Sequence, residues 1–161
     1  MAKFLISETI HSYPVLTVRL GQTGAGNQYG ATENGKAVKL TADSRYELCA
    51  LGDAIEGVIV NSELATQGTV DGYSIGGIVG KGYKNVTFDG TQAAGTGAIA
   101  VGAYVVVGDV TAKGTKLEGP LKVRSATTQA DAKAAPFKAR VVSLGSAGTG
   151  AVGTVGVIEL L

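Results

Sequence analysis

The residue types that most often carry chemistry are scarce in this chain of 161 residues, which has one histidine, His11, one cysteine, Cys49, and no tryptophan. A cysteine beside a histidine can form a nucleophile and its base. Cys49, however, lies in the stretch Glu47–Leu51, and a free cysteine among apolar neighbours usually serves as a small core residue. One cysteine and one histidine also cannot build a zinc site with several such ligands. We therefore expect no catalytic residues, no metal and no cofactor, and a protein that is not an enzyme.

Two glycine-rich stretches have the spacing of nucleotide-binding loops. Residues Gly30–Ala37 match a phosphate-binding P-loop, except that Ala37 replaces the serine or threonine that holds Mg²⁺. Residues Gly148–Gly153 match the Gly-x-Gly-x-x-Gly dinucleotide fingerprint. Both loops should open a helix, whose N-terminus binds the phosphate. Because a strand pattern follows each of them, we interpret both as chance matches in a chain with 25 glycines.

The composition favours a mainly β fold. Glycine, alanine, threonine and serine make up 71 of the 161 residues, and β-branched residues come in short runs between Gly and Asp turn signals. Such spacing predicts a small β-barrel or β-sandwich-like domain with at most one short helix. The expected strands are Ala37–Leu40, Tyr46–Ala50, Ile55–Asn61, Tyr73–Val79, Asn85–Phe88, Ala103–Val107, Ala139–Ser143 and Thr154–Leu160.

Two segments depart from the strand pattern. Residues 1–35 combine an apolar start with the glycine-rich tract Gly21–Gly35, so we expect an N-terminal arm and linker there and the β domain at 36–161. Within that domain, residues 111–138 form an inserted region. It contains the one helix-permissive stretch, Thr127–Ala135, which Pro136 ends; a short helix and a loop both fit this stretch.

Positive charge gathers in the inserted region. The segment 113–140, which covers most of this region, holds seven Lys or Arg residues against two acidic ones. One interpretation is a basic surface that contacts an acidic partner, and the other is an ordinary solvated face. The candidate contact residues are Lys113, Lys116, Lys122 and Arg124.

The overall charge and the apolar runs restrict the partners. A net charge of +1 gives no nucleic-acid footprint, and the tyrosines and lysines at 73–84 fit a half-buried sheet face as well as a base-stacking patch. No apolar run approaches the 18 residues of a membrane-spanning helix. We expect neither membrane insertion nor direct nucleic-acid binding, and a single cysteine suits a reducing compartment.

The order of several motifs resembles that of tailed-bacteriophage capsid decoration proteins, also called cement or head-stabilising proteins. The resemblance rests on Lys36–Asp43, Leu51–Val60, Tyr73–Gly80 and Val101–Asp109. It implies a small β-rich virion protein that is commonly trimeric and is made in the host cytoplasm. Such a protein sits on the capsid exterior and bridges neighbouring major capsid proteins, often through an N-terminal arm.

On this resemblance, the expected capsid-contact arm consists of Phe4, Leu5, Ile6, Tyr13, Pro14, Val15 and Leu16. An extended apolar arm can add to a neighbouring sheet edge, where backbone hydrogen bonds hold it. Two alternatives remain open. The chain fits another virion component, such as a tail or fibre piece, and it fits a small-barrel binding module for protein, nucleic acid or a small molecule.

Overall fold

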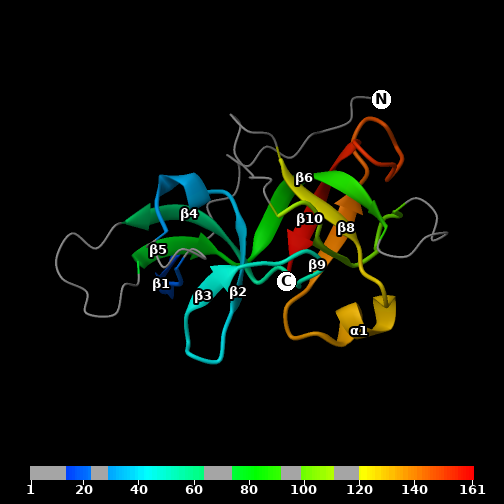
Figure 1. Cartoon of the computed structure of the whole chain (residues 1–161). Helices are drawn as coiled ribbons and strands as arrows, with labels where there is room; N and C mark the ends of the chain where they lie inside the picture. The colour runs from blue at the N-terminus through cyan, green and yellow to red at the C-terminus, as the bar shows by residue number, and fades with distance from the viewer. Residues whose placement is uncertain (1–13, 23–28, 64–73, 92–98, 111–119) are drawn as a thin grey trace.

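The computed structural model describes residues 14–22, 29–63, 74–91, 99–110 and 120–161. These residues form two β units that lie side by side (Figure 1). The first unit is a closed barrel in the order β1-β3-β2-β4-β5, and the second is a five-stranded sheet in the order β7-β8-β6-β10-β9. The expectation of a mainly β fold with a small barrel is therefore confirmed.

The barrel is built mostly from antiparallel neighbours, and only β1 and β3 run parallel. A single 3-10 turn, η1 (Ala31–Glu33), precedes β2. The barrel strands are β1 (Leu16–Leu20), β2 (Ala37–Leu40), β3 (Tyr46–Leu48), β4 (Gly57–Glu63) and β5 (Ser74–Val79).

The second sheet has two edge strands, and an isolated bridge between Tyr104 and Arg140 brings these edges together. The helix α1 (Gln129–Ala134) lies in the connection from β8 to β9 and confirms the helical interpretation of that stretch. The strands of the sheet are β6 (Gly82–Thr91), β7 (Val105–Val107), β8 (Leu121–Ser125), β9 (Ala139–Ser143) and β10 (Val155–Leu160).

The prediction of an arm and linker over residues 1–35 is wrong at Leu16–Leu20, because these residues form the barrel strand β1. This strand pairs with β5 along its whole length, from Leu16 opposite Ile78 to Leu20 opposite Ser74. Leu20 is fully buried in the barrel core, as is Tyr29 from the expected linker. Strand β1 closes the barrel by pairing with both β5 and β3. These residues therefore belong to the β domain.

The inserted region also needs a correction, because part of it is a structural strand. Strand β8 lies between β7 and β6 and runs parallel to β6. Its Leu121 and Val123 are buried, while Lys122 and Arg124 alternate with them on the other face. The alternation covers only five residues, and the many lysines around it made the region resemble a solvated loop in the sequence.

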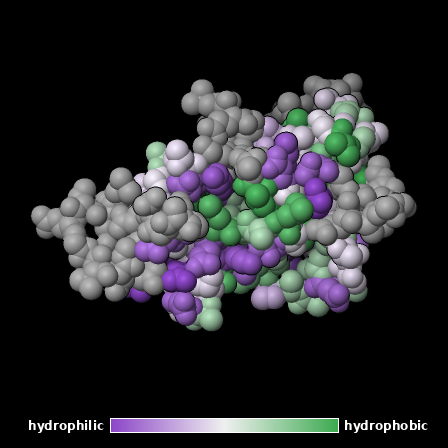
Figure 2. Space-filling view, viewed as in Figure 1, coloured by the Kyte–Doolittle hydropathy of each residue, from purple (hydrophilic) through white to green (hydrophobic). Residues whose placement is uncertain are grey.

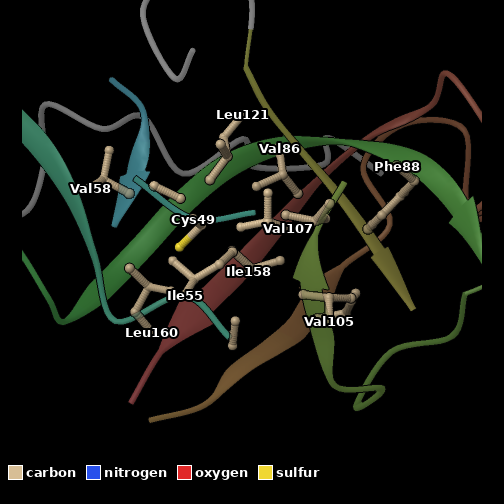
Figure 3. Close-up of a cluster of buried hydrophobic side chains, with 14 of the residues drawn as sticks. Cys49, Ile55, Val58, Val86, Phe88, Val105, Val107, Leu121, Ile158 and Leu160 are labelled. Carbon is tan, nitrogen blue, oxygen red and sulfur yellow. The ribbon is translucent and has the colours of Figure 1, made fainter. Parts of the chain in front are cut away.

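Besides the core inside the barrel, a second apolar cluster is shared by the barrel and the second sheet. Cys49, Ile55 and Val58 come from the barrel side and pack in the same cluster as Val86 and Ile158 of the second sheet (Figure 3). The segment between β3 and β4 reaches across this junction. The Gly52 N–H donates to the Val107 carbonyl at 2.9 Å, and the Val107 N–H donates to the Asp53 carbonyl at 3.0 Å. The two units are therefore joined by packing as well as by the chain.

Candidate contact surfaces

The expected contact residues are only partly within the described structure. Phe4, Leu5, Ile6 and Tyr13 of the arm, and Lys113 and Lys116 of the basic surface, lie outside the described residues, as does His11. Pro14, Val15, Leu16, Lys122 and Arg124 are described. They fall on two separate surfaces, one on the barrel and one on the second sheet.

The first surface consists of exposed apolar residues of the barrel, namely Val15 and Val60, which both lie over Gly77, and Ile75, two residues before that glycine. Their exposed fractions are 53%, 40% and 51%. We call these three residues the apolar wall; they come from the residue before β1, from β4 and from β5. Leu16, which is 52% exposed, adjoins Val15 and pairs with Ile78.

Two local features of the backbone create the wall. In β4 the pairing register shifts between Ile59 and Asn61, and Val60 is left without a partner in β5. In β5, Gly77 has no side chain, and a Cβ there would lie 2.5 Å from Cγ1 of Val15 and 3.2 Å from Cγ2 of Val60. Both valines therefore cover this glycine. The bulge turns Val60 outward, and the glycine lets Val15 lie against the strand.

Sequence reasoning identified Val15 but missed Val60 and Ile75. Val60 ends a nearly continuous apolar run, which suggests a strand buried on both faces rather than an exposed residue. Ile75 stands between Ser74, which is buried, and a pair of glycines. The signal that was available is this Gly-Gly pair in a strand, since glycine inside a strand often marks a bulge or a close approach.

The second surface is the outer face of β8, and its charges are locally compensated. The Lys122 Nζ lies 3.0 Å from Oδ2 of Asp109, and Arg124 Nη2 lies 2.9 Å from Oδ2 of Asp89. The hydrogen bond to Asp109 raises the pKa of Lys122, with the negative charge of the same carboxylate adding to this effect. Lys122 and Arg124 lie on the same face of β8, and each already has an acidic partner.

Apolar residues also gather where the two β units meet. Figure 2 shows hydrophobic residues at the middle of one face, over this junction, with hydrophilic residues on both sides. Large apolar side chains are exposed elsewhere as well, among them Leu51, Val101 and Val152. Single exposed apolar residues are ordinary on protein surfaces, whereas a contiguous group marks a contact site.

Cys49 is a buried thiol. Its Sγ donates a hydrogen bond to the Ala54 carbonyl at 3.5 Å. Burial raises the pKa of Cys49 to about 12, and the negative charge of Asp53 adds to the rise. Because the thiolate is the reactive form, Cys49 is an inert core residue at neutral pH. The interpretation of Cys49 as a core residue is confirmed.

Neither glycine-rich stretch opens a helix. After Gly30 the chain makes the short turn η1 and enters strand β2. The Gly30 N–H donates to Glu33 Oε2 at 2.8 Å, so the chain's own carboxylate takes a donor that a phosphate would need. After Gly153 the chain enters β10. The interpretation of both stretches as chance matches is supported by this local structure.

The part of the chain that the structure describes has neither a metal-ligand cluster nor a membrane-spanning helix. No three His, Cys, Asp or Glu residues are grouped so that they could hold a metal ion. No helix there has both the length and the apolar character needed to cross a membrane.

The fold and its two surfaces define a small, mainly β protein with a closed barrel joined to a second sheet through a common core. Comparisons with protein-family models, with curated proteins and with solved structures found no match to the chain.

Proposed function

We propose that this chain is a structural virion protein that binds the outside of an assembled bacteriophage capsid and stabilises it by bridging neighbouring major capsid proteins. The observation that carries the proposal is the apolar wall. Val15 and Val60 expose apolar side chains over Gly77 of the barrel, and Ile75, two residues before that glycine in β5, is also exposed. The chain that leads into this face begins with the apolar sequence Phe4-Leu5-Ile6.

Contiguity between the wall and the N-terminal sequence supports a single extended contact. Val15 is the last residue before β1 and lies against Gly77, so the preceding segment joins the barrel at the wall. Apolar area buried against a partner contributes about 25 cal/mol per Å², less the cost of ordering the groups involved. The proposal therefore combines two elements, namely a preformed wall and an apolar segment attached to it.

The resemblance to capsid decoration proteins supports the same role. Its motif at Leu51–Val60 includes the first part of β4, and its motif at Tyr73–Gly80 contains β5; these two motifs supply two of the three wall residues. A capsid repeats its surface many times, so a homotrimer or another cyclic oligomer of this chain would bind with several weak contacts at once. Linked contacts of this kind reinforce one another through effective concentration.

The test is sedimentation of the purified chain with phage heads that lack it. The double variant Val60→Asp/Ile75→Asp places two charges on the wall, and we expect it to bind heads at least about tenfold more weakly than the unmodified chain. The unmodified chain should also raise the resistance of the heads to heat and to low ionic strength.

The matched control is Val152→Asp/Val155→Asp, which places the same charges on two exposed valines, one in the turn before β10 and one at the start of β10. It should bind heads within about threefold of the unmodified chain. Circular dichroism of both variants checks that each stays folded. Equal binding by the two double variants, or no binding by the unmodified chain, would contradict the proposal.

A further inference from the structure

The connection between β8 and β9 joins two strands from opposite sides of the second sheet, whose edge strands are β7 and β9. Strands β8 and β9 are not neighbours in this sheet, so residues 127–138, which we call the strap, must pass from one side to the other. The strap contains α1 and lies at one end of the second sheet (Figure 1). None of its twelve residues is buried.

The side chain of Gln129 fastens the strap near α1, and at the other end of the strap the Leu161 N–H donates to the Lys138 carbonyl at 3.0 Å. The Tyr104 N–H donates to Gln129 Oε1 at 2.7 Å, and Gln129 Nε2 donates to the Tyr104 carbonyl at 2.9 Å. The Ala126 N–H also donates to that carbonyl, at 3.1 Å. The amide of Gln129 thus continues the β7–β8 ladder where the backbone leaves it, and it occupies both backbone groups of Tyr104.

The packing under the strap is incomplete. A cavity of about 40 Å³ lies between the strap and the edge strands of the sheet. Ala132, Ala135 and Phe137 line it from the strap, and the sheet side includes Ile55, Val105 and Ala139. A void removes dispersion contacts from the residues that line it, so the strap is held less firmly than a fully packed element.

The sheet does not depend on the strap for its own pairing. Three residue pairs from Val105–Ser125 to Val107–Val123 join β7 to β8. The edges also meet directly, because the Val141 N–H donates to the Ala103 carbonyl at 2.9 Å and the Tyr104–Arg140 bridge lies beside it. Removal of the strap leaves all of these bonds in place.

We infer that the strap is a conformational latch, which opens as a unit while the barrel and the second sheet stay folded, with Gln129 as its fastening. Opening breaks the two Gln129 hydrogen bonds and uncovers the apolar cavity between β7 and β9. Segments with few buried contacts and exposed hydrogen bonds are those that open at low free energy.

Native-state hydrogen exchange of the full chain tests the inference. The amides of Ala132 and Ala135, bonded to the carbonyls of Thr128 and Asp131, report the strap, and the amide of Val107 reports the sheet. We expect the strap amides to exchange at a rate nearly independent of low denaturant, and the Val107 amide to follow global unfolding. In Gln129→Ala, exchange of the strap amides should rise about tenfold, with the rate at Val107 unchanged.

Two further variants complete the test. Lys133→Ala, on the exposed part of α1, should leave exchange of the strap amides within about twofold. Ala132→Val adds two methyl groups toward the cavity. It should slow the exchange of the strap amides about threefold. The inference is overturned if the strap amides show the same denaturant dependence as Val107, or if Gln129→Ala changes them no more than Lys133→Ala does.

Discussion

Burial determines the chemistry of Cys49, the one cysteine of the chain. The thiol lies in the core shared by the barrel and the second sheet, and its pKa rises to about 12 from an ordinary value of 9.0. The raised pKa makes the native state bind the thiol proton more tightly than the unfolded chain does. The stability of the protein therefore depends on alkaline pH through this residue.

We predict that the free energy of unfolding falls between pH 9 and pH 10, and that Cys49→Ala reduces this fall by about 1 kcal/mol. Well below pH 9 the thiol is protonated in both states and has no effect. As the pH rises through 9, the unfolded chain loses the proton while the native state keeps it up to about 12, so unfolding becomes more favourable. Urea denaturation at several pH values measures this.

The interval must end at pH 10, because burial also raises the pKa of Tyr29 and Tyr46 from 10.0. Those tyrosines lower stability above pH 10 in both proteins by the same argument. If the unmodified chain and Cys49→Ala lose the same stability between pH 9 and pH 10, then the thiol titrates near its ordinary pKa and is not buried as described.

Strand β1 is the element that distinguishes a barrel from an open sheet, because it joins β5 to β3. Its inward side places Leu20 against Ile59, Ile78 and Tyr29. At its other end, Leu16 is half exposed. One strand thus contributes both to the core and to the edge of the apolar wall.

Deletion of residues 1–20 would remove strand β1 from the barrel. Point substitutions on the wall are therefore the cleaner test of capsid attachment.

We predict that Leu20→Ala lowers the free energy of unfolding by about 2 to 5 kcal/mol, because it leaves a cavity in the barrel core. The same substitution at Leu16, in the same strand, should cost less than about 1 kcal/mol, because that side chain is half exposed. Chemical denaturation followed by circular dichroism compares the two. Equal losses would mean that β1 is not a barrel strand.

At the scale of the whole molecule, the barrel and the second sheet are one folding unit. Core residues from both sides of the junction form a single cluster, and the segment around Ile55 contributes to it from the barrel side (Figure 3). Backbone hydrogen bonds between this segment and Val107 cross the same junction. Apolar contacts shared in this way make the two units unfold together.

We predict one cooperative transition, and we expect Ile55→Ala to shift it for both units by the same amount, about 2 to 5 kcal/mol. Resolved amide signals of Val38 in the barrel and Val123 in the second sheet, followed through a denaturant titration, measure the two midpoints. Leu51→Ala is the control, since Leu51 belongs to the same segment but is exposed. Separate midpoints for Val38 and Val123 would show instead that the two units fold independently.

The local pattern of the sequence determined the class of fold. Short β-branched runs between glycine and aspartate turns predicted most of the strands, and the same pattern after Gly35 and Gly153 argued against helices there. The apolar neighbours of Cys49 predicted its burial, and Pro136 placed the end of the one helix. These features depend on residues next to one another in the chain, which is why the sequence alone reveals them.

Tertiary structure decided which of the other residues belong to the core and which to the surface. Strand β1 alternates like any other strand, but only its pairing with β5 makes Leu20 a core residue. Lys122 and Arg124 are compensated because Asp109 and Asp89 reach them from other segments. The apolar wall needs the bulge at Val60 and the missing side chain of Gly77, brought together by register. Pairing between distant segments sets these outcomes, and alternation within one segment carries no information about its partner.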